Sequence, residues 1–244
     1  MKNIKLTIEY DGTNYVGWQR QDNGLSVQQV VEEAIEKITG ERVKVNGSGR
    51  TDSGAHALGQ TANFHTKTSI PTIRLPAALN SVLPDDIAVK DARCMPLDFH
   101  ARFSCKAKEY MYQVYNGKTR PAVMRRYCYH VPKDLDGDAM VKALKLLEGT
   151  HDFSCFKAAG SSVTNCVRQI YRADLSKKED MLIFTFKGSG FLYNMVRIMM
   201  GTVLEIGMGK RPVENIPKLL ESKDRSLAGP TVPAKGLFLV KVYY

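Results

Sequence analysis

The stretch Asn46-Gly47-Ser48-Gly49-Arg50-Thr51-Asp52-Ser53-Gly54-Ala55-His56-Ala57-Leu58-Gly59-Gln60 is the most informative part of the chain. Its four glycines allow positive φ angles and a close approach of the backbone to a ligand. Residues 43–46 and 60–65 on either side predict two strands that bracket a glycine-rich turn. The turn places one charged pair, Arg50 and Asp52, on a constrained loop, where binding and catalytic residues concentrate.

Neither standard phosphate-binding loop fits this stretch. A Walker loop requires Gly-Lys-Ser/Thr after four spacer residues, and the dinucleotide fingerprint requires a third glycine where this chain has Asp52. A plain turn is the simplest interpretation of residues 51–54, because Asp and Ser side chains favour Asx turns. From the tetrapeptide alone, catalysis by Asp52 is therefore only a hypothesis.

The segments around the loop predict further regular elements in the first half. Residues 4–8 alternate apolar and polar side chains, which predicts a half-buried strand. A helix is expected over residues 26–39, with Ser26 as N-cap, Gln29 completing a capping box and Gly40 as terminator. A short helix at residues 76–82 and a strand at residues 87–94 complete this half.

The second half repeats the same grouping of strands and helices. Strands are expected at residues 109–115, 168–176, 182–187 and 236–244, and helices at residues 138–147, 191–206 and 213–222. This pattern predicts an α+β fold with two related halves, each an antiparallel sheet with helices on one face, joined around a central basic cleft. With a boundary near residues 100–107, the expected domains are residues 1–105 and 106–244.

The positive charge is concentrated in one segment. The 244 residues contain 35 Lys and Arg against 25 Asp and Glu, a net charge of +10. Residues 1–100 hold 11 basic and 12 acidic side chains. Residues 101–130 hold seven basic and one acidic side chain, and residues 131–244 hold 17 basic and 12 acidic side chains. Tyrosines are interleaved with the basic segment, and cations with aromatic faces favour binding of looped RNA. These tyrosines are Tyr110, Tyr112, Tyr115, Tyr127 and Tyr129.

Several function classes are excluded or disfavoured by composition. The most apolar region, residues 191–209, contains Arg197 and Glu205, so no membrane span is expected. The amino terminus alternates polar and apolar residues, unlike a signal peptide. The five cysteines lie at least eleven residues apart, which excludes CxxC chemistry and suits a reducing cytosol. His151 and Cys155 have no accompanying ligand pair, so no metal site is expected. No cofactor motif is recognised either, and we expect a cytoplasmic protein without a small-molecule cofactor.

Residues 49–57 closely resemble the active-site motif of the tRNA pseudouridine synthase A family. Further segments resemble that family in the same order along the chain. Residues 10–21 are similar to its opening strand and loop, 108–112 to its tyrosine strand, 191–197 to its arginine helix and 233–237 to its closing segment. The resemblance therefore covers essentially the whole chain.

The resemblance implies isomerisation of uridine to pseudouridine at positions 38, 39 and 40 of the tRNA anticodon stem-loop. It makes Asp52 the catalytic residue that initiates cleavage of the glycosidic bond. Three first steps stay open: attack on C1′, attack on the uracil ring, or removal of a ribose proton. The resemblance also implies a homodimer in which each tRNA contacts both subunits.

Three substrate-binding residues are expected besides Asp52; the resemblance assigns Tyr110 and Arg197, and the need to extrude the target base suggests Arg50. Arg197 would be the cation that keeps Asp52 ionised, because burial alone would neutralise a carboxylate. Arg50 would contact phosphate or hold the target nucleotide out of the base stack. Tyr110 would stack on the uracil and could help to remove the C5 proton, whereas His56 is interpreted as a structural residue of the loop.

Two other functions remain as alternatives. A non-catalytic RNA-binding module would also use the basic, tyrosine-rich segment, but it would have no use for Asp52. A hydrolase with an aspartate nucleophile is weaker, because glycosidases normally need a second carboxylate and none lies in the motif.

Overall fold

The computed structural model describes residues 1–161 and 163–244, and over these residues the chain forms five α-helices and ten strands. The α+β class expected from the sequence is confirmed. The chain divides into two compact units, Met1–Lys106 with Phe238–Tyr244, and Ala107–Leu237. The expected second domain, residues 106–244, thus differs at its end, because strand β10 (Leu237–Tyr243) pairs with strand β3 (His56–Thr66) of the first unit.

The sheet of the first unit is built around β1 (Lys2–Tyr10), which pairs antiparallel with β3 and with β4 (Ile87–Met95). A short strand, β2 (Asn46–Gly47), pairs antiparallel with β3. The prediction of a purely antiparallel sheet is wrong for β10, which runs parallel to β3. The chain returns to β10 only after the whole second unit, so no hairpin turn sets its direction.

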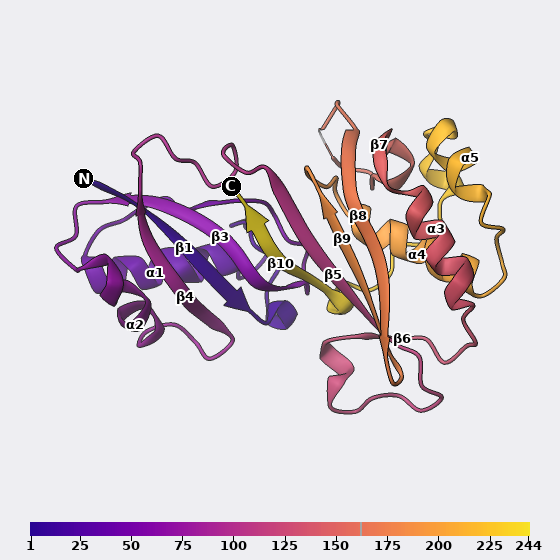
Figure 1. The fold of residues 1–244 in the computed structure, drawn as a ribbon. Coiled ribbons are helices and arrows are strands. Elements are labelled where there is room, and N and C mark those ends of the chain that lie inside the picture. The colour runs from indigo at the N-terminus through magenta and orange to yellow at the C-terminus, as the bar shows by residue number, and fades with distance from the viewer. Residues whose placement is uncertain (162) are drawn as a thin grey trace. The chain divides into compact units, whose positions relative to one another are not determined.

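The first unit contains two helices, α1 (Val27–Thr39) and α2 (Leu75–Asn80). They contact each other (Figure 1). Helix α1 begins as predicted, with Ser26 Oγ accepting a hydrogen bond from Gln29 N at 3.3 Å. It ends at Gly40, whose φ of 72° is left-handed. The second half of the predicted capping box is replaced by a bond from Gln29 Nε2 to Glu33 Oε1 at 2.9 Å.

The sheet of the second unit has the strand order β5, β9, β8 and β7, all antiparallel neighbours. Strand β6 pairs with β5 in parallel, which again departs from the antiparallel expectation. Helices α3, α4 and α5 lie on one side of β8 and β9 (Figure 1). The bounds are β5 (Ala107–Tyr115), β6 (Tyr129–His130), β7 (Gly149–Asp152), β8 (Val167–Lys178), β9 (Met181–Gly188), α3 (Gly137–Leu146), α4 (Met195–Gly207) and α5 (Asn215–Ser222).

Several predicted elements have the wrong extent; strand β3, for example, was expected from residue 60 but begins at His56. Helix α4 was expected from residue 191 but begins at Met195, because Asn194 has a left-handed φ of 58°. The strand expected at residues 43–46 is reduced to β2, which starts at Asn46. In α4 all residues except Arg197 and Glu205 are buried, so its apolar surface surrounds the helix rather than forming one stripe. None of the helices that the structure describes is long and apolar enough to cross a membrane.

A buried amide network fixes the segment that follows β4. Asn63 Oδ1 accepts a hydrogen bond from Ala101 N at 2.8 Å, and Asn63 Nδ2 donates to Asn3 Oδ1 at 2.9 Å. Asn3 Nδ2 in turn donates to the carbonyl oxygens of Pro96 and Phe99, at 2.9 and 2.8 Å. Asn3 and Asn63 are both buried, so their amides replace water as partners for this backbone.

We expect Asn63→Ala to lower the free energy of unfolding by about 2 to 4 kcal/mol, because it leaves Ala101 N–H and Asn3 Oδ1 buried without this partner. Urea denaturation measures the change. Gln29→Ala is the matched control, since the Gln29–Glu33 bond is exposed, and should stay within about 0.5 kcal/mol of wild type. Equal effects of the two substitutions would show that the network does not stabilise the unit.

Candidate active site

The loop that carries Asp52 connects two paired strands, since it leaves β2 at Gly47 and enters β3 at His56. Its first arm is bonded directly to β3: Ser48 N donates to Thr61 O at 2.7 Å. The buried Gln60 side chain accepts from Ser48 Oγ at 2.7 Å and donates to Gly49 O at 2.9 Å. The chain therefore approaches Asp52 from a fixed position.

The centre of the loop is held by the segment that follows β1. Tyr10 Oη and Thr51 Oγ1 lie 2.7 Å apart in a buried hydrogen bond, and Trp18 N donates to Thr51 O at 3.3 Å. Burial raises the pKa of the Tyr10 phenol, so the hydroxyl stays protonated and available to this bond. Thr51 is thereby fixed through both its side chain and its carbonyl group, directly before Asp52.

The second arm of the loop is bonded to the same segment. Tyr15 O accepts from Gly54 N and from Ser53 Oγ, both at 3.3 Å. Within the loop, Ala55 N donates to Asp52 O at 3.0 Å, which closes a turn around Asp52. The backbone is held on both sides of the carboxylate.

Two glycines make this contact between the segments possible. A Cβ at Gly12 would lie 1.9 Å from Ala55 O, and a Cβ at Gly17 would lie 2.5 Å from Thr51 O. Gly17 also has φ +102°, a conformation that side chains with a Cβ rarely adopt. The backbone of residues 12–17 therefore packs directly on the backbone of the Asp52 loop.

His56 is the first residue of β3, where the Asp52 loop ends. It is buried, and its ring stacks on Phe238 with 4.7 Å between centroids. Its Nδ1 lies 3.1 Å from Gly12 N and 3.0 Å from Asp11 Oδ1. This nitrogen accepts from the Gly12 backbone when it is unprotonated and donates to the Asp11 carboxylate when it is protonated, so either contact ties residues 11–12 to β3.

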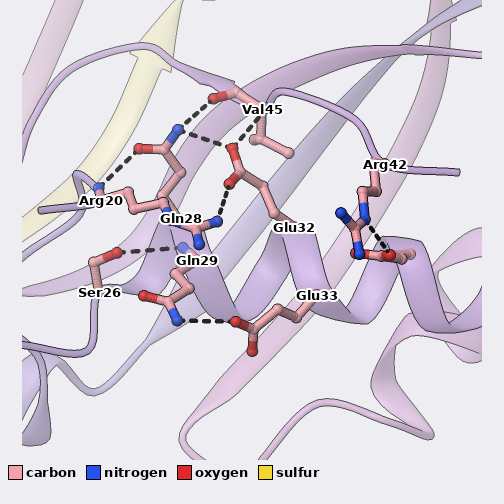
Figure 2. Close-up of polar contacts among 9 residues, drawn as sticks. Arg20, Ser26, Gln28, Gln29, Glu32, Glu33, Arg42 and Val45 are labelled. Carbon is pink, nitrogen blue, oxygen red and sulfur yellow. Dashed lines mark hydrogen bonds and ion pairs between the residues drawn. The ribbon is translucent and has the colours of Figure 1, made fainter. Parts of the chain in front are cut away.

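Helix α1 supports both segments that lead to the loop (Figure 2). Gln28 N donates to Trp18 O at 2.9 Å, and Gln28 Oε1 accepts from Arg20 N at 3.0 Å. Val45 is bonded on both sides: Val45 N donates to Glu32 Oε1, and Gln28 Nε2 donates to Val45 O, each at 3.0 Å. Side chains of α1 thus take the place of the strand partner that residues 43–45 were expected to have.

The sequence-predicted residues of the first unit, Arg50 and Asp52, lie two positions apart on this loop. Asp52 is half-buried and Arg50 is exposed. The loop therefore combines a partly desolvated carboxylate with a cation that is accessible to a large ligand. Sequence analysis missed Tyr10, Trp18 and Gln60, although the glycines at 12 and 17 within the 10–21 motif signalled a close backbone contact.

The other two predicted residues belong to the second unit. Tyr110 is on β5, where it is 7% exposed and meets Phe191 edge to face at 5.0 Å between centroids. Tyr112, on the same face of β5, donates from its hydroxyl to Pro233 O at 2.7 Å. Burial raises the pKa of Tyr112, and the nearby positive charge of Arg197 acts in the opposite direction.

Arg197 is half-buried on α4, and its guanidinium is held in one orientation. Its Nη1 donates to Asn194 Oδ1 at 2.7 Å, and its Nε donates to Val232 O at 2.8 Å. Asn194 is the N-cap residue of α4, and its backbone is in the left-handed conformation. A fixed guanidinium is suited to hold a carboxylate or phosphate.

No metal site is formed by the described residues, which contain no group of three or more His, Cys, Asp or Glu side chains placed to hold an ion.

Comparison with known proteins finds relatives that match this chain over its full length. A family model described as tRNA pseudouridine synthase matches residues 6–104 and 143–244. The tRNA pseudouridine synthase A of Caldicellulosiruptor saccharolyticus is 52% identical over 244 residues, covering all of both chains. Those of Clostridium acetobutylicum and Acetivibrio thermocellus are 51% and 49% identical, again over the full length of both chains. These matches include both units, so the chain is of the class of RNA-modifying isomerases.

The chain belongs to the tRNA pseudouridine synthase family. The resemblance noted in the sequence is thereby confirmed. Among solved structures, the archaeal box H/ACA sRNP Nop10-Cbf5 complex matches 82% of this chain and 44% of that chain, with a TM-score of 0.38 and 11% identity.

We expect Gly17→Ala to destabilise the loop by about 1 to 3 kcal/mol, because the new Cβ meets Thr51 O and the left-handed φ is strained. Urea denaturation measures the stability, and turnover should fall with it. Gly137→Ala is the control, since Gly137 is the first residue of α3 and has no atom within 4 Å of a Cβ. It should be neutral or stabilising by up to about 1 kcal/mol, and equal stability of both variants would contradict the close contact.

Proposed function

We propose that this protein isomerises uridine to pseudouridine at positions 38, 39 and 40 of the tRNA anticodon stem-loop, and that Asp52 starts the reaction. The observation that carries the proposal is the double attachment of the Asp52 loop, to Gln60 and Thr61 on one side and to Tyr15 on the other. A carboxylate on such a loop needs little reorganisation when the substrate arrives.

The reaction is an internal rearrangement of one nucleotide. The bond between N1 of uracil and C1′ of ribose breaks, the base turns, and C5 bonds to C1′. C5 loses its proton and N1 gains one, so atoms and electrons balance without an external donor. Attack of Asp52 on C1′ or on the base, and removal of a ribose proton, all require the ionised form of its carboxylate.

The remaining site residues take the roles that the family motifs suggest. Arg197 supplies the positive charge that keeps Asp52 ionised, and its fixed guanidinium supports this assignment. Tyr110 stacks on the extruded uracil and assists removal of the C5 proton. Arg50, which is exposed, contacts phosphate or holds the flipped nucleotide.

Assembly and location follow from the same family assignment. We propose a homodimer in which each tRNA contacts both subunits, as the family resemblance implies. We also propose a cytoplasmic location. All five cysteines are free thiols, which suits a reducing compartment.

We expect Asp52→Asn to reduce release of tritium from 5-tritiated uridine in tRNA to at most about a thousandth of wild type, because no carboxylate remains to start bond cleavage. Affinity for tRNA should stay within a few fold. Asp22→Asn is the control, because Asp22 is an exposed carboxylate of the same unit, and it should keep full activity.

Mapping pseudouridine in the reacted tRNA tests position as well as chemistry. Wild type should modify positions 38, 39 and 40, and Asp52→Asn should modify none of them. Full activity of Asp52→Asn would refute the catalytic assignment. If wild type binds tRNA but modifies nothing, the protein is the non-catalytic RNA-binding module instead, and free uracil as product would indicate a hydrolase.

A second variant, Arg197→Gln, tests the charge balance at the carboxylate. A carboxylate that loses a nearby cation becomes protonated at higher pH. The acidic limb of the pH–rate profile should therefore move to higher pH, with part of the activity recovered as the pH is raised. The acidic limb of Arg197→Lys should lie at a pH between those of Arg197→Gln and wild type. An unshifted pH–rate profile in Arg197→Gln would show that Arg197 does not keep Asp52 ionised.

A further inference from the structure

A strongly exposed aromatic side chain lies in an ordered turn of the first unit, outside the Asp52 loop. Phe103 is 77% exposed, although a phenylalanine is normally among the most buried residues. It lies in residues 100–104, directly before the boundary at Lys106. None of the roles proposed above uses it.

The turn that carries Phe103 is held by its own hydrogen bonds. His100 Nδ1 accepts from Arg102 N at 3.1 Å and from Phe103 N at 3.4 Å. Ser104 N donates to His100 O at 2.9 Å, and His100 N donates to Ser104 Oγ at 3.2 Å. The His100 ring also lies against Phe103, with 4.3 Å between centroids. Phe103 is therefore presented in a restricted orientation despite its exposure.

The turn is attached to the core of the first unit through Ala101. Ala101 N donates to the buried Asn63 Oδ1 at 2.8 Å, and Tyr244 Oη donates to Ala101 O at 2.9 Å. An aromatic ring that is held in place before binding loses little conformational entropy when a ligand stacks on it. This feature distinguishes Phe103 from an exposed side chain on a mobile loop.

Charge beside the ring indicates what would cover it. The Arg102 guanidinium carbon lies 5.7 Å from the centre of the Phe103 ring, and Arg102 and Lys106 are both exposed. An aromatic face next to a cation matches a nucleotide, since the base has a flat apolar face and the phosphate a negative charge. Because the adjoining segment, residues 101–130, carries seven basic residues and one acidic residue, a polyanion is favoured over a second copy of this basic chain.

We propose that Phe103 and Arg102 form a second nucleotide-binding platform, on which an unstacked base of the bound tRNA lies against Phe103 while Arg102 holds an adjacent phosphate. The platform is additional to the uracil site of Asp52. The inference rests on tRNA being the substrate, as proposed above.

Equilibrium binding of unmodified tRNA to the full-length protein tests the platform, with all substitutions made in the Asp52→Asn background so that no turnover occurs. Phe103→Ala should weaken binding by about 5- to 150-fold, the range for loss of one stacked base. Phe103→Trp, which keeps a stacking face, should bind within about twofold of the parent. Ile73→Ala removes an aliphatic side chain that is 85% exposed in the same unit, and it should leave the affinity unchanged.

Salt dependence separates the two residues of the platform. Arg102→Gln should reduce the slope of log affinity against log salt by about 0.7 to 0.9, because one phosphate contact is lost. Phe103→Ala should weaken binding with the slope unchanged. Thermal unfolding of each variant should match the parent, as expected for exposed substitutions.

Four outcomes would overturn the platform. The first two are binding by Phe103→Ala as tight as that of the parent, or equal losses in Phe103→Ala and Ile73→Ala. The third is a salt slope that Arg102→Gln leaves unchanged. The fourth is unaltered tRNA affinity combined with dissociation of Phe103→Ala into monomers on sedimentation, which would assign Phe103 to an interface between copies of the chain. Failure of the parent itself to bind tRNA would refute the proposed function as well, so the two failures are distinguishable.

Discussion

Close contact between two backbone segments, residues 12–17 and 51–55, is the constraint on which the candidate site depends. Gly12 and Gly17 leave no room for a Cβ, so the main chain of one segment lies on the main chain of the other. Tyr10 and Trp18 form hydrogen bonds with Thr51, and Tyr15 accepts one from Gly54. These bonds hold the Asp52 loop against the segment that contains Gly12 and Gly17. Any side chain inserted between the segments would move the carboxylate together with the loop, which is why 10–21 and 49–57 act as one structural unit.

Elements with strong periodicity were predicted well from the sequence, and the errors have local causes. The helix from Ser26 to Gly40 was predicted with both caps, because cap and stop signals agree with its apolar spacing. Residues 43–45 were predicted as strand, but the Gln28 and Glu32 side chains satisfy the Val45 backbone instead. Helix α4 starts four residues late, because the left-handed conformation of Asn194 has no signal in a hydrophobic pattern.

The candidate site was only partly visible in the sequence. The glycines and the Arg50–Asp52 pair indicated a constrained loop, and the family resemblance supplied the roles of the residues. The contacts of Tyr10 with Thr51 and of Asn63 with Ala101 join residues about forty positions apart, so no local pattern reports them. The parallel pairing of β10 with β3 was missed for the same reason, since it joins Phe238 and Leu239 to His56 and Ala57, far away in the sequence.

Binding and catalysis place opposite demands on the charge of this protein. A basic segment attracts RNA from a distance, and salt screens that attraction over about 8 Å at physiological ionic strength. In the proposed reaction, the same RNA brings negative phosphates toward Asp52, and nearby negative charge favours the protonated form of a carboxylate, which could not start that reaction. A cation that acts at short range in a desolvated site is screened much less, so it can offset the phosphates where the general basic surface cannot. Salt should therefore control mainly how tightly the RNA binds, while the local balance of charge around Asp52 controls whether bound RNA reacts.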